Sequence, residues 1–348
     1  MRFLLDAEQA EFGRTLGRML AAADTPAAVR AWGAGDSGPG RAAWRRLAGA
    51  GVFGLAVPEK HEGAGLLPIE LVVSFVELGR HAVPGPLAET VAAAVLLDRL
   101  GDADGLADTW LPAIAAGDAM VSYADLSRGP YALDAATADV TLLVDGDTLR
   151  ASGGNGPVQP SVDPVRRLTR CAAGAVLASG PAVRAAAAQA ADTARLLTAA
   201  QALGVGRRLL DDTVAYVKQR TQFGVAIGSF QAVKHRLADV LLALELAEPL
   251  VYGAAVELAG ASQAGVAGSA DATGVGIAMA KVAAGEAAYT AARAALQLHG
   301  ALGYTDELDL SLWIRKARAL RGAWGTPAEC RARILPGPAS AGAQIFHE

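Results

Sequence analysis

The stretch of sequence from residue 220 to residue 239 decides the fold of this chain. It contains Arg220-Thr221-Gln222-Phe223-Gly224, then Ile227-Gly228-Ser229-Phe230-Gln231, and then His235-Arg236-Leu237-Ala238-Asp239. A cation, a glycine turn and the start of a long helix follow one another there. The apolar side chains of this helix keep the three- and four-residue spacing of a bundle helix: Phe230, Val233, Leu237, Leu241, Leu244 and Val251. The stretch therefore predicts a helical bundle that opens at a cationic turn.

Helical patterns fill most of the rest of the chain. Apolar residues recur at helical spacing over 6–24, over 68–80 and over two segments between 84 and 117. They do so again over 183–219, 230–259, 270–299 and about 305–320. A stretch of Gly, Ala, Asp and Ser at 33–40 predicts a loop.

The period changes between residues 118 and 182. Segments 120–123 and 138–144 predict strands, and Asp145-Gly146-Asp147 predicts a hairpin turn. We therefore expect a mainly α protein with a small β domain. The predicted boundaries are an N-terminal helical domain over 1–117, a reduced middle β domain over 118–182, and a C-terminal four-helix bundle domain over 183–348.

Composition and charge exclude several classes of protein. The formal net charge of −4 comes without a basic stripe, which argues against nucleic acid as a partner. Cys171 and Cys330 have no metal-ligand spacing around them, so we expect no zinc site or disulfide framework, and a reducing cytoplasm fits. The N-terminal residues meet a charge too early for a signal peptide, and no uncharged apolar run approaches the roughly 20 residues of a membrane-spanning helix. We expect a soluble, cytoplasmic protein.

The chain resembles the acyl-CoA dehydrogenase family over nearly its whole length, and in particular the short, actinobacterial-type subunits of heteromeric members. The most specific motifs are the 220–239 stretch and Gln297-Leu298-His299-Gly300-Ala301-Leu302-Gly303-Tyr304. In the N-terminal part the resemblance rests on Leu55-Ala56-Val57-Pro58-Glu59 with Gly63 and Gly65, and on Glu77-Leu78-Gly79-Arg80. It implies the family's fold, in which the C-terminal bundle domain carries the FAD and oligomer interface.

The resemblance also implies which residues contact FAD. Arg220, Gln222 and Phe223 would meet the ADP half of an FAD bound largely by the neighbouring subunit. Gln231, Gln297 and Gly300 would line the same groove, and Thr326 would approach the flavin ring. A guanidinium suits pyrophosphate because it donates in a bidentate fork and keeps its charge. Taken singly, each of these residues is also consistent with a structural role, either as an arginine at a helix end or as a buried polar side chain.

The family's catalytic glutamate has no counterpart at either position that the family uses. Trp324 stands at the usual one and Ala194 at the other. Asp192 is the fallback acid, although a first-turn acid favoured by the helix dipole is the simpler interpretation. Arg195 matches an arginine that would bind substrate or orient a partner's carboxylate. The Thr-Glu-Pro…Gly-Ser-Asp signature that flanks the flavin ring in the family is not recognisable around residues 122–131.

These observations lead to an expectation about function. Dehydrogenation of an acyl thioester removes a proton from Cα while hydride leaves Cβ for the flavin, so a base must be held in an apolar pocket. We expect a sister subunit to supply it in an α2β2 complex, and a homo-oligomer is the alternative assembly. The resemblance implies fatty-acyl or steroid side-chain CoA thioesters as substrates, and an electron-transfer partner. A flavin-dependent oxygenase or oxidase on the same fold and a non-catalytic structural subunit stay open.

Overall fold

The computed structural model describes residues 5–101, 105–264 and 270–335, so the outer ends of the first and last predicted domains lie outside the described residues. The N-terminal part is helical. Its α-helices are α1 (Ala7–Ala21), α2 (Thr25–Gly33), α3 (Gly38–Gly49), α4 (Pro68–Arg80), α5 (Leu87–Leu100) and α6 (Leu106–Ala116), with short 3-10 turns at Phe53–Ala56 and Glu59–His61.

The prediction of a loop over 33–40 is only partly right. Helix α2 runs up to Gly33, and helix α3 already begins at Gly38 with Pro39 in its first turn, where proline fits because no amide donor is needed. The sequence pattern missed α2 itself. Its start is fixed by the carboxylate of Asp24, which accepts from the amide of Ala27 at 3.1 Å.

A five-stranded sheet follows, in the order β1-β3-β4-β5-β2. The strands are β1 (Val121–Asp125), β2 (Tyr131–Leu133), β3 (Val140–Asp145), β4 (Thr148–Gln159) and β5 (Leu168–Ser179). Strands β1 and β3 pair in parallel, and the other pairs are antiparallel. Asp145 pairs with Thr148 across the predicted hairpin turn. The long strands β4 and β5 had no clear sequence signal, because their central residues are mostly glycine and alanine.

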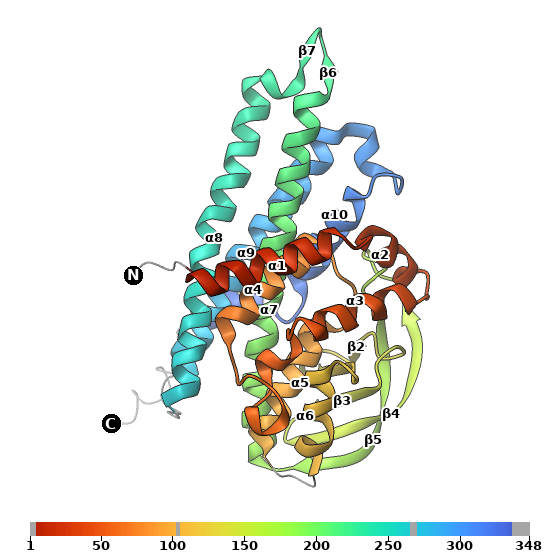
Figure 1. Cartoon of the computed structure of the whole chain (residues 1–348), viewed down its shortest axis with the longest axis vertical. Helices are drawn as coiled ribbons and strands as arrows, with labels where there is room; N and C mark the ends of the chain where they lie inside the picture. The colour runs from red at the N-terminus through yellow and green to blue at the C-terminus, as the bar shows by residue number, and fades with distance from the viewer. Residues whose placement is uncertain (1–4, 102–104, 265–269, 336–348) are drawn as a thin grey trace, which may run out of the picture.

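The C-terminal part contains three long helices that stand side by side along the long axis of the molecule (Figure 1). They are α7 (Pro181–Gln219), α8 (Gln231–Ala264) and α9 (Ala270–His299), followed by α10 (Leu310–Gly322) and α11 (Pro327–Ile334). A two-stranded hairpin, β6 (Thr221–Gln222) and β7 (Val225–Ala226), joins α7 to α8 at one end of the molecule. The mainly α fold with a small β region agrees with the expected fold class.

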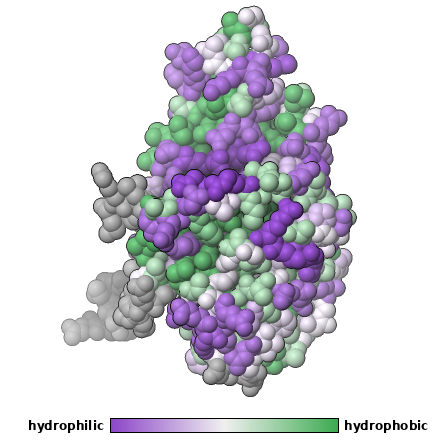
Figure 2. Space-filling view, viewed as in Figure 1, coloured by the Kyte–Doolittle hydropathy of each residue, from purple (hydrophilic) through white to green (hydrophobic). Residues whose placement is uncertain are grey.

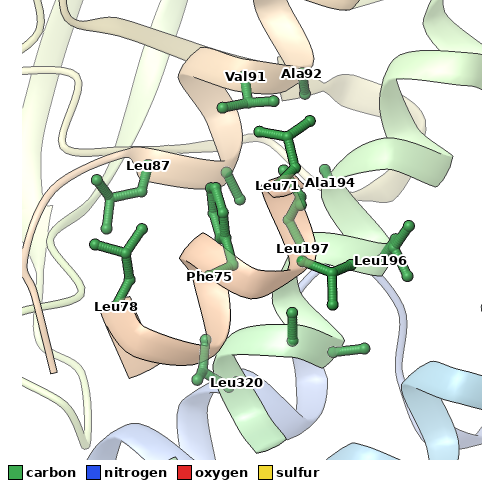
Figure 3. Close-up of a cluster of buried hydrophobic side chains, with 14 of the residues drawn as sticks. Leu71, Phe75, Leu78, Leu87, Val91, Ala92, Ala194, Leu196, Leu197 and Leu320 are labelled. Carbon is green, nitrogen blue, oxygen red and sulfur yellow. The ribbon is translucent and has the colours of Figure 1, made fainter. Parts of the chain in front are cut away.

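The core lies where the N-terminal helices meet the bundle. Figure 3 shows side chains of α4, α5, α7 and α10 packed together, among them Leu71, Phe75, Val91, Leu197 and Leu320. These side chains are at most 5% exposed. Each side chain of this size stabilises the fold by roughly 1.5–3 kcal/mol when fully buried. Helix α7 is therefore held between the N-terminal helices and the other bundle helices.

Two glycines allow α4 and α7 to cross closely. A Cβ atom added to Gly204 would lie 1.9 Å from the carbonyl oxygen of Val76, and one added to Gly79 would lie 2.1 Å from that of Gln201. We expect Gly204→Ala to lower the free energy of unfolding by about 1–3 kcal/mol, because the helices must move apart. Urea unfolding of the purified protein measures this.

Gly260→Ala is the matched control, because Gly260 lies in α8 with no atom near its added Cβ. Alanine there should stabilise the protein by roughly 0.5–1 kcal/mol. Equal stability of Gly204→Ala and wild type would show that α4 and α7 do not cross as closely as described.

Among the described residues, no helix combines the length and the hydropathy of a membrane-spanning segment.

Candidate functional site

The hairpin between α7 and α8 presents Arg220, Gln222 and Phe223 to solvent. Gln222 pairs with Val225, so Phe223 and Gly224 form a two-residue turn with φ angles of 54° and 81°. Positive φ at both positions is the geometry of a tight hairpin turn, but it costs a phenylalanine roughly 1–2 kcal/mol. Phe223 is 92% exposed. Its ring lies edge-on to Phe230, with 6.3 Å between ring centroids, and most of its surface is open to contact with another molecule.

The cation at this tip has no counter-charge within the described residues. The backbone of Arg220 is fixed at both sides, since its amide donates to Tyr216 and its carbonyl accepts from Ile227. Its exposed side chain makes no ion pair or hydrogen bond in the described chain, and Gln222 and Gln231, which follow in the hairpin and at the start of α8, are also exposed. An unpaired guanidinium with two amides can bind an anion such as a pyrophosphate.

The end of α9 lies against the end of α7 close to this tip. The ring of His299 stacks on Tyr216, with 4.1 Å between ring centroids. His299 is buried and its Nδ1 donates to the carbonyl of Ala295 at 2.8 Å, so its ring holds two helices together. Gln297 and Gly300 are exposed beside it. The structure thus brings the end of α9 to the same end of the bundle as Arg220.

A second site lies at the turn between α10 and α11, around Trp324. A cavity of about 240 Å³ is lined there by α5, β1, β2 and the turn, and we call it the Trp324 pocket. Its lining includes Glu89, Tyr123, Arg166, Trp324 and Thr326. The indole Nε1 of Trp324 donates to Oε1 of Glu89 at 2.8 Å, and its ring stacks on Tyr123 with 5.3 Å between centroids. Trp324 therefore fills part of the pocket that it lines.

The turn that carries Trp324 is held from three sides. Nε of Arg195 donates to the carbonyl of Trp324 at 3.1 Å. Nζ of Lys281 donates to the carbonyls of Leu320 and Arg321, both at 3.0 Å, at the end of α10. Thr326 caps α11, because its hydroxyl accepts from the amide of Glu329. These contacts hold Trp324 at a φ of 55°.

Asp192 and Arg195 have structural partners in this chain. Asp192 accepts from Arg195 and, with both carboxylate oxygens, from Arg333 at 2.6 and 2.8 Å. Both carboxylate oxygens are thus already engaged by guanidinium groups of this chain, so Asp192 is not free to approach a substrate proton. Arg195 is only 4% exposed. Its contacts hold the Trp324 turn rather than reach toward a ligand.

A small charged chamber lies behind the Trp324 pocket. It has a volume of about 30 Å³ and is lined by Glu89, Asp134, Asp163, Arg166 and Lys316. Glu89 and Arg166 line both the chamber and the Trp324 pocket. Burial raises the pKa of Glu89, against the opposing charge of Arg166 and the hydrogen bond from Trp324. The inner wall of the pocket is therefore polar.

The charge of the chamber depends on pH through the carboxyl group of Asp134. Burial and the nearby Glu89 raise the pKa of Asp134 to about 7, although Trp32, Arg167 and Lys316 oppose the shift. One carboxylate oxygen accepts from Trp32 at 2.9 Å, and the other is buried with no partner in the described residues. Because the folded-state pKa is raised, Asp134 costs no stability below pH 4, and the cost grows as the pH rises to about 7.

We expect Asp134→Asn to stabilise the protein at pH 8 by about 1–2 kcal/mol and to change the stability little at pH 4, where the folded-state aspartate is protonated and almost none of the cost has developed. Asparagine keeps an acceptor for Trp32 and tolerates the φ of 54° found here. Urea unfolding at the two pH values measures the difference. A gain of the same size at both pH values would mean that titration of Asp134 is not its cause.

Glu89 and Tyr123 are pocket residues that sequence reasoning missed. Glu89 reads as an ordinary first-turn acid of an alanine-rich helix, and Tyr123 as a strand residue. Only the return of the chain after α10 brings Trp324 between them.

Arg220 and Thr326 lie in two separate places. Arg195 touches the Trp324 turn, and it precedes Arg220 along α7 by roughly 35 Å.

The two halves of the chain each match a known domain. Residues 6–118 match the family model of the acyl-CoA dehydrogenase N-terminal domain, and residues 184–335 match that of the acyl-CoA dehydrogenase C-terminal domain. The chain therefore belongs to the acyl-CoA dehydrogenase family, as its motifs predicted.

Several proteins are similar to this chain over most of its length. The chain is 33% identical to acyl-CoA dehydrogenase IpdE2 of Mycobacterium tuberculosis, over 92% of this chain and 94% of that protein. It matches a structure of the steroid ACAD Tcur3481-Tcur3483 G363A variant with a TM-score of 0.75 and 26% identity, over 94% of this chain and 96% of that one. It shares the fold of one chain in a crystal structure of the ChsE4-ChsE5 complex of Mycobacterium tuberculosis, with a TM-score of 0.81 and 22% identity, over 99% of this chain and 100% of that chain. An FAD-dependent dehydrogenase has the same fold.

Proposed function

We propose that this chain is one subunit of a flavin-dependent acyl-CoA dehydrogenase complex, in which it holds the ADP half of an FAD whose flavin ring lies in a partner subunit. The observation that carries this proposal is the exposed tip with Arg220, Gln222 and Phe223, whose cation has no counter-charge in the described chain. The distance along α7 separates this tip from Thr326, so one FAD would not reach both within one chain. A neighbouring subunit completes the cofactor site.

The proposed roles at the tip follow from the chemistry of each side chain. The Arg220 guanidinium donates to the pyrophosphate, and Gln222, Gln231 and Gln297 supply neutral donors and acceptors to the rest of the ADP half. Phe223 packs against the cofactor or the partner. Gly300, at a φ of 61°, leaves backbone within reach of the phosphates.

The proposed reaction is α,β-desaturation of an acyl-CoA thioester, for which bound flavin supplies the acceptor of the hydride from Cβ. The α-proton needs a base, and indole cannot accept it. Asp192 is paired with two arginines, and Glu89 lies behind Trp324. We therefore assign the base to the partner subunit. Steroid side-chain or fatty-acyl thioesters are the proposed substrates, which the likeness to a steroid ACAD supports.

The surface of α8 supports association with a partner. Leu241, Leu242 and Leu246 are 44–63% exposed on this helix. Figure 2 shows apolar residues at the surface over this part of α8, beyond the polar band of α1. The predicted apolar stripe is thus only partly covered within one chain, since Leu244 and Val251 are buried while Leu241 is not. Exposed apolar stretches of this kind mark protein interfaces.

Expression of the chain with and without a sister subunit from the same genome tests the proposal. We expect the chain alone to be colourless, and the purified complex to absorb near 450 nm and to oxidise an acyl-CoA with an artificial electron acceptor. A yellow homo-oligomer with dehydrogenase activity would contradict the assignment of the base to a partner. Fast reaction of the reduced flavin with oxygen would instead favour an oxidase or oxygenase.

A further inference from the structure

We propose that the Trp324 pocket is closed by its own side chains to both flavin ring and acyl thioester, so that each pair of unlike subunits carries one FAD, with its ring in the partner. This inference rests on the proposed function. The family resemblance places Trp324 at the position of the catalytic glutamate and Thr326 beside the flavin ring. Because both residues line the same cavity, this pocket is where ring and substrate would lie in this chain.

The indole of Trp324 joins the two walls that a bound ring would have to separate. Trp324 comes from the turn after α10, and Tyr123 comes from β1. Their rings stack with an interplanar angle of 11°. Tyr123 is 1% exposed, so this contact is fully excluded from solvent on the side of the strand. A flat ligand could enter between them only if the stack opened.

Two polar contacts fix the indole in this position. The indole Nε1 donates to Glu89, which is 4% exposed. The backbone carbonyl of Trp324 accepts from Arg195. If the indole swung away, the buried carboxyl of Glu89 would lose its donor, which costs about 1–3 kcal/mol for a buried polar group. The left-handed backbone of Trp324 is therefore held by the surrounding structure.

The remaining space suits neither ring nor acyl chain. The pocket volume of about 240 Å³ lies below the roughly 300–1,000 Å³ of ligand pockets. Beyond Glu89 the space ends in the charged chamber with Asp134, Asp163 and Lys316. A hydrocarbon chain there would strip water from charged groups and offer them no hydrogen bond. The residues of this pocket thus do not fit the flavin ring that the family places there.

The location of the two ends of FAD in the purified complex of unlike subunits tests the inference. One sample is reconstituted with FAD that carries an azide at position 8 of the flavin ring, and a second with FAD that carries an azide on adenine. After irradiation, mass spectrometry of the digested chains identifies the labelled peptides. Flavin released by heat and measured at 450 nm gives the ratio of FAD to subunit pairs.

We expect a ratio near one FAD per pair, with the ring azide attached to the partner only. A ratio near two, or ring label within residues 121–131 or 322–329 of this chain, would overturn the inference. The adenine azide separately tests the proposed function, because it should label residues 220–231 of this chain. Absence of adenine label there, in a complex that holds flavin, would remove the proposed function and the inference that rests on it.

Discussion

Replacing Arg220 by alanine is expected to weaken FAD retention in the complex about 10- to 150-fold, which corresponds to roughly 1.5–3 kcal/mol for hydrogen bonds to a charged group. The guanidinium is exposed and has no competing partner in the described residues, so its full donor capacity is free for the pyrophosphate. Loss of the side chain should leave the fold intact, because the backbone of residue 220 makes the contacts that hold the turn. Titration of the apo-complex with FAD, followed by flavin absorbance, measures the affinity.

Arg184→Ala is the matched control for this variant. Arg184 is also an exposed arginine on α7, but it lies near the opposite end of the helix and pairs with Asp147. We expect its loss to leave the FAD affinity of the complex unchanged. If Arg220→Ala retained FAD as well as Arg184→Ala, the tip would have no part in holding the cofactor.

Replacing Trp324 by glutamate is expected to destabilise the chain by about 3–5 kcal/mol and to produce no dehydrogenase activity in the isolated chain. The variant loses the stack on Tyr123 and the donor to Glu89, and it places a second carboxyl beside a buried one. The charged chamber also remains in place. Urea unfolding measures the stability, and an artificial electron acceptor measures the activity.

Trp324→Phe separates the two parts of this effect. Phenylalanine keeps an aromatic ring against Tyr123 but has no N–H for Glu89, so the expected loss is about 1–3 kcal/mol. Dehydrogenase activity in the isolated Trp324→Glu chain would show that the pocket can hold flavin and substrate and that this chain lacks only the base. Such a result would contradict the closed pocket.

The sequence predicted the helices well where one apolar face is buried within the chain. The helix predicted for 68–80 is α4, and the helices predicted for 183–219 and 270–299 agree closely with α7 and α9. Their buried faces leave a regular period in the sequence. The stripe from Phe230 to Val251 predicted a bundle helix, and α8 packs in the bundle. Phe230 and Leu241 are nevertheless exposed, because α8 packs against other helices of this chain on only part of its surface.

The candidate site was harder to predict, because its contacts join distant segments. Nothing in the sequence around Glu89 distinguishes it from a helix-start acid, and its hydrogen bond with Trp324 spans residues far apart in the chain. The interpretation of Asp192 as a first-turn acid was wrong, because α7 already begins at Pro181. Asp192 is instead paired with Arg333, which approaches from α11. By contrast, the residues at the tip lie close together in sequence, so a local motif was enough to identify them. Their contacts with FAD stay predictions.

An experimental structure of the complex with FAD tests the central claim most directly, through the position of the Arg220 guanidinium. We predict that a guanidinium nitrogen lies about 2.7–2.9 Å from a pyrophosphate oxygen of an FAD whose flavin ring contacts the partner subunit. An Arg220 side chain in solvent away from any FAD, or an FAD with both ends bound in this chain, would contradict the account.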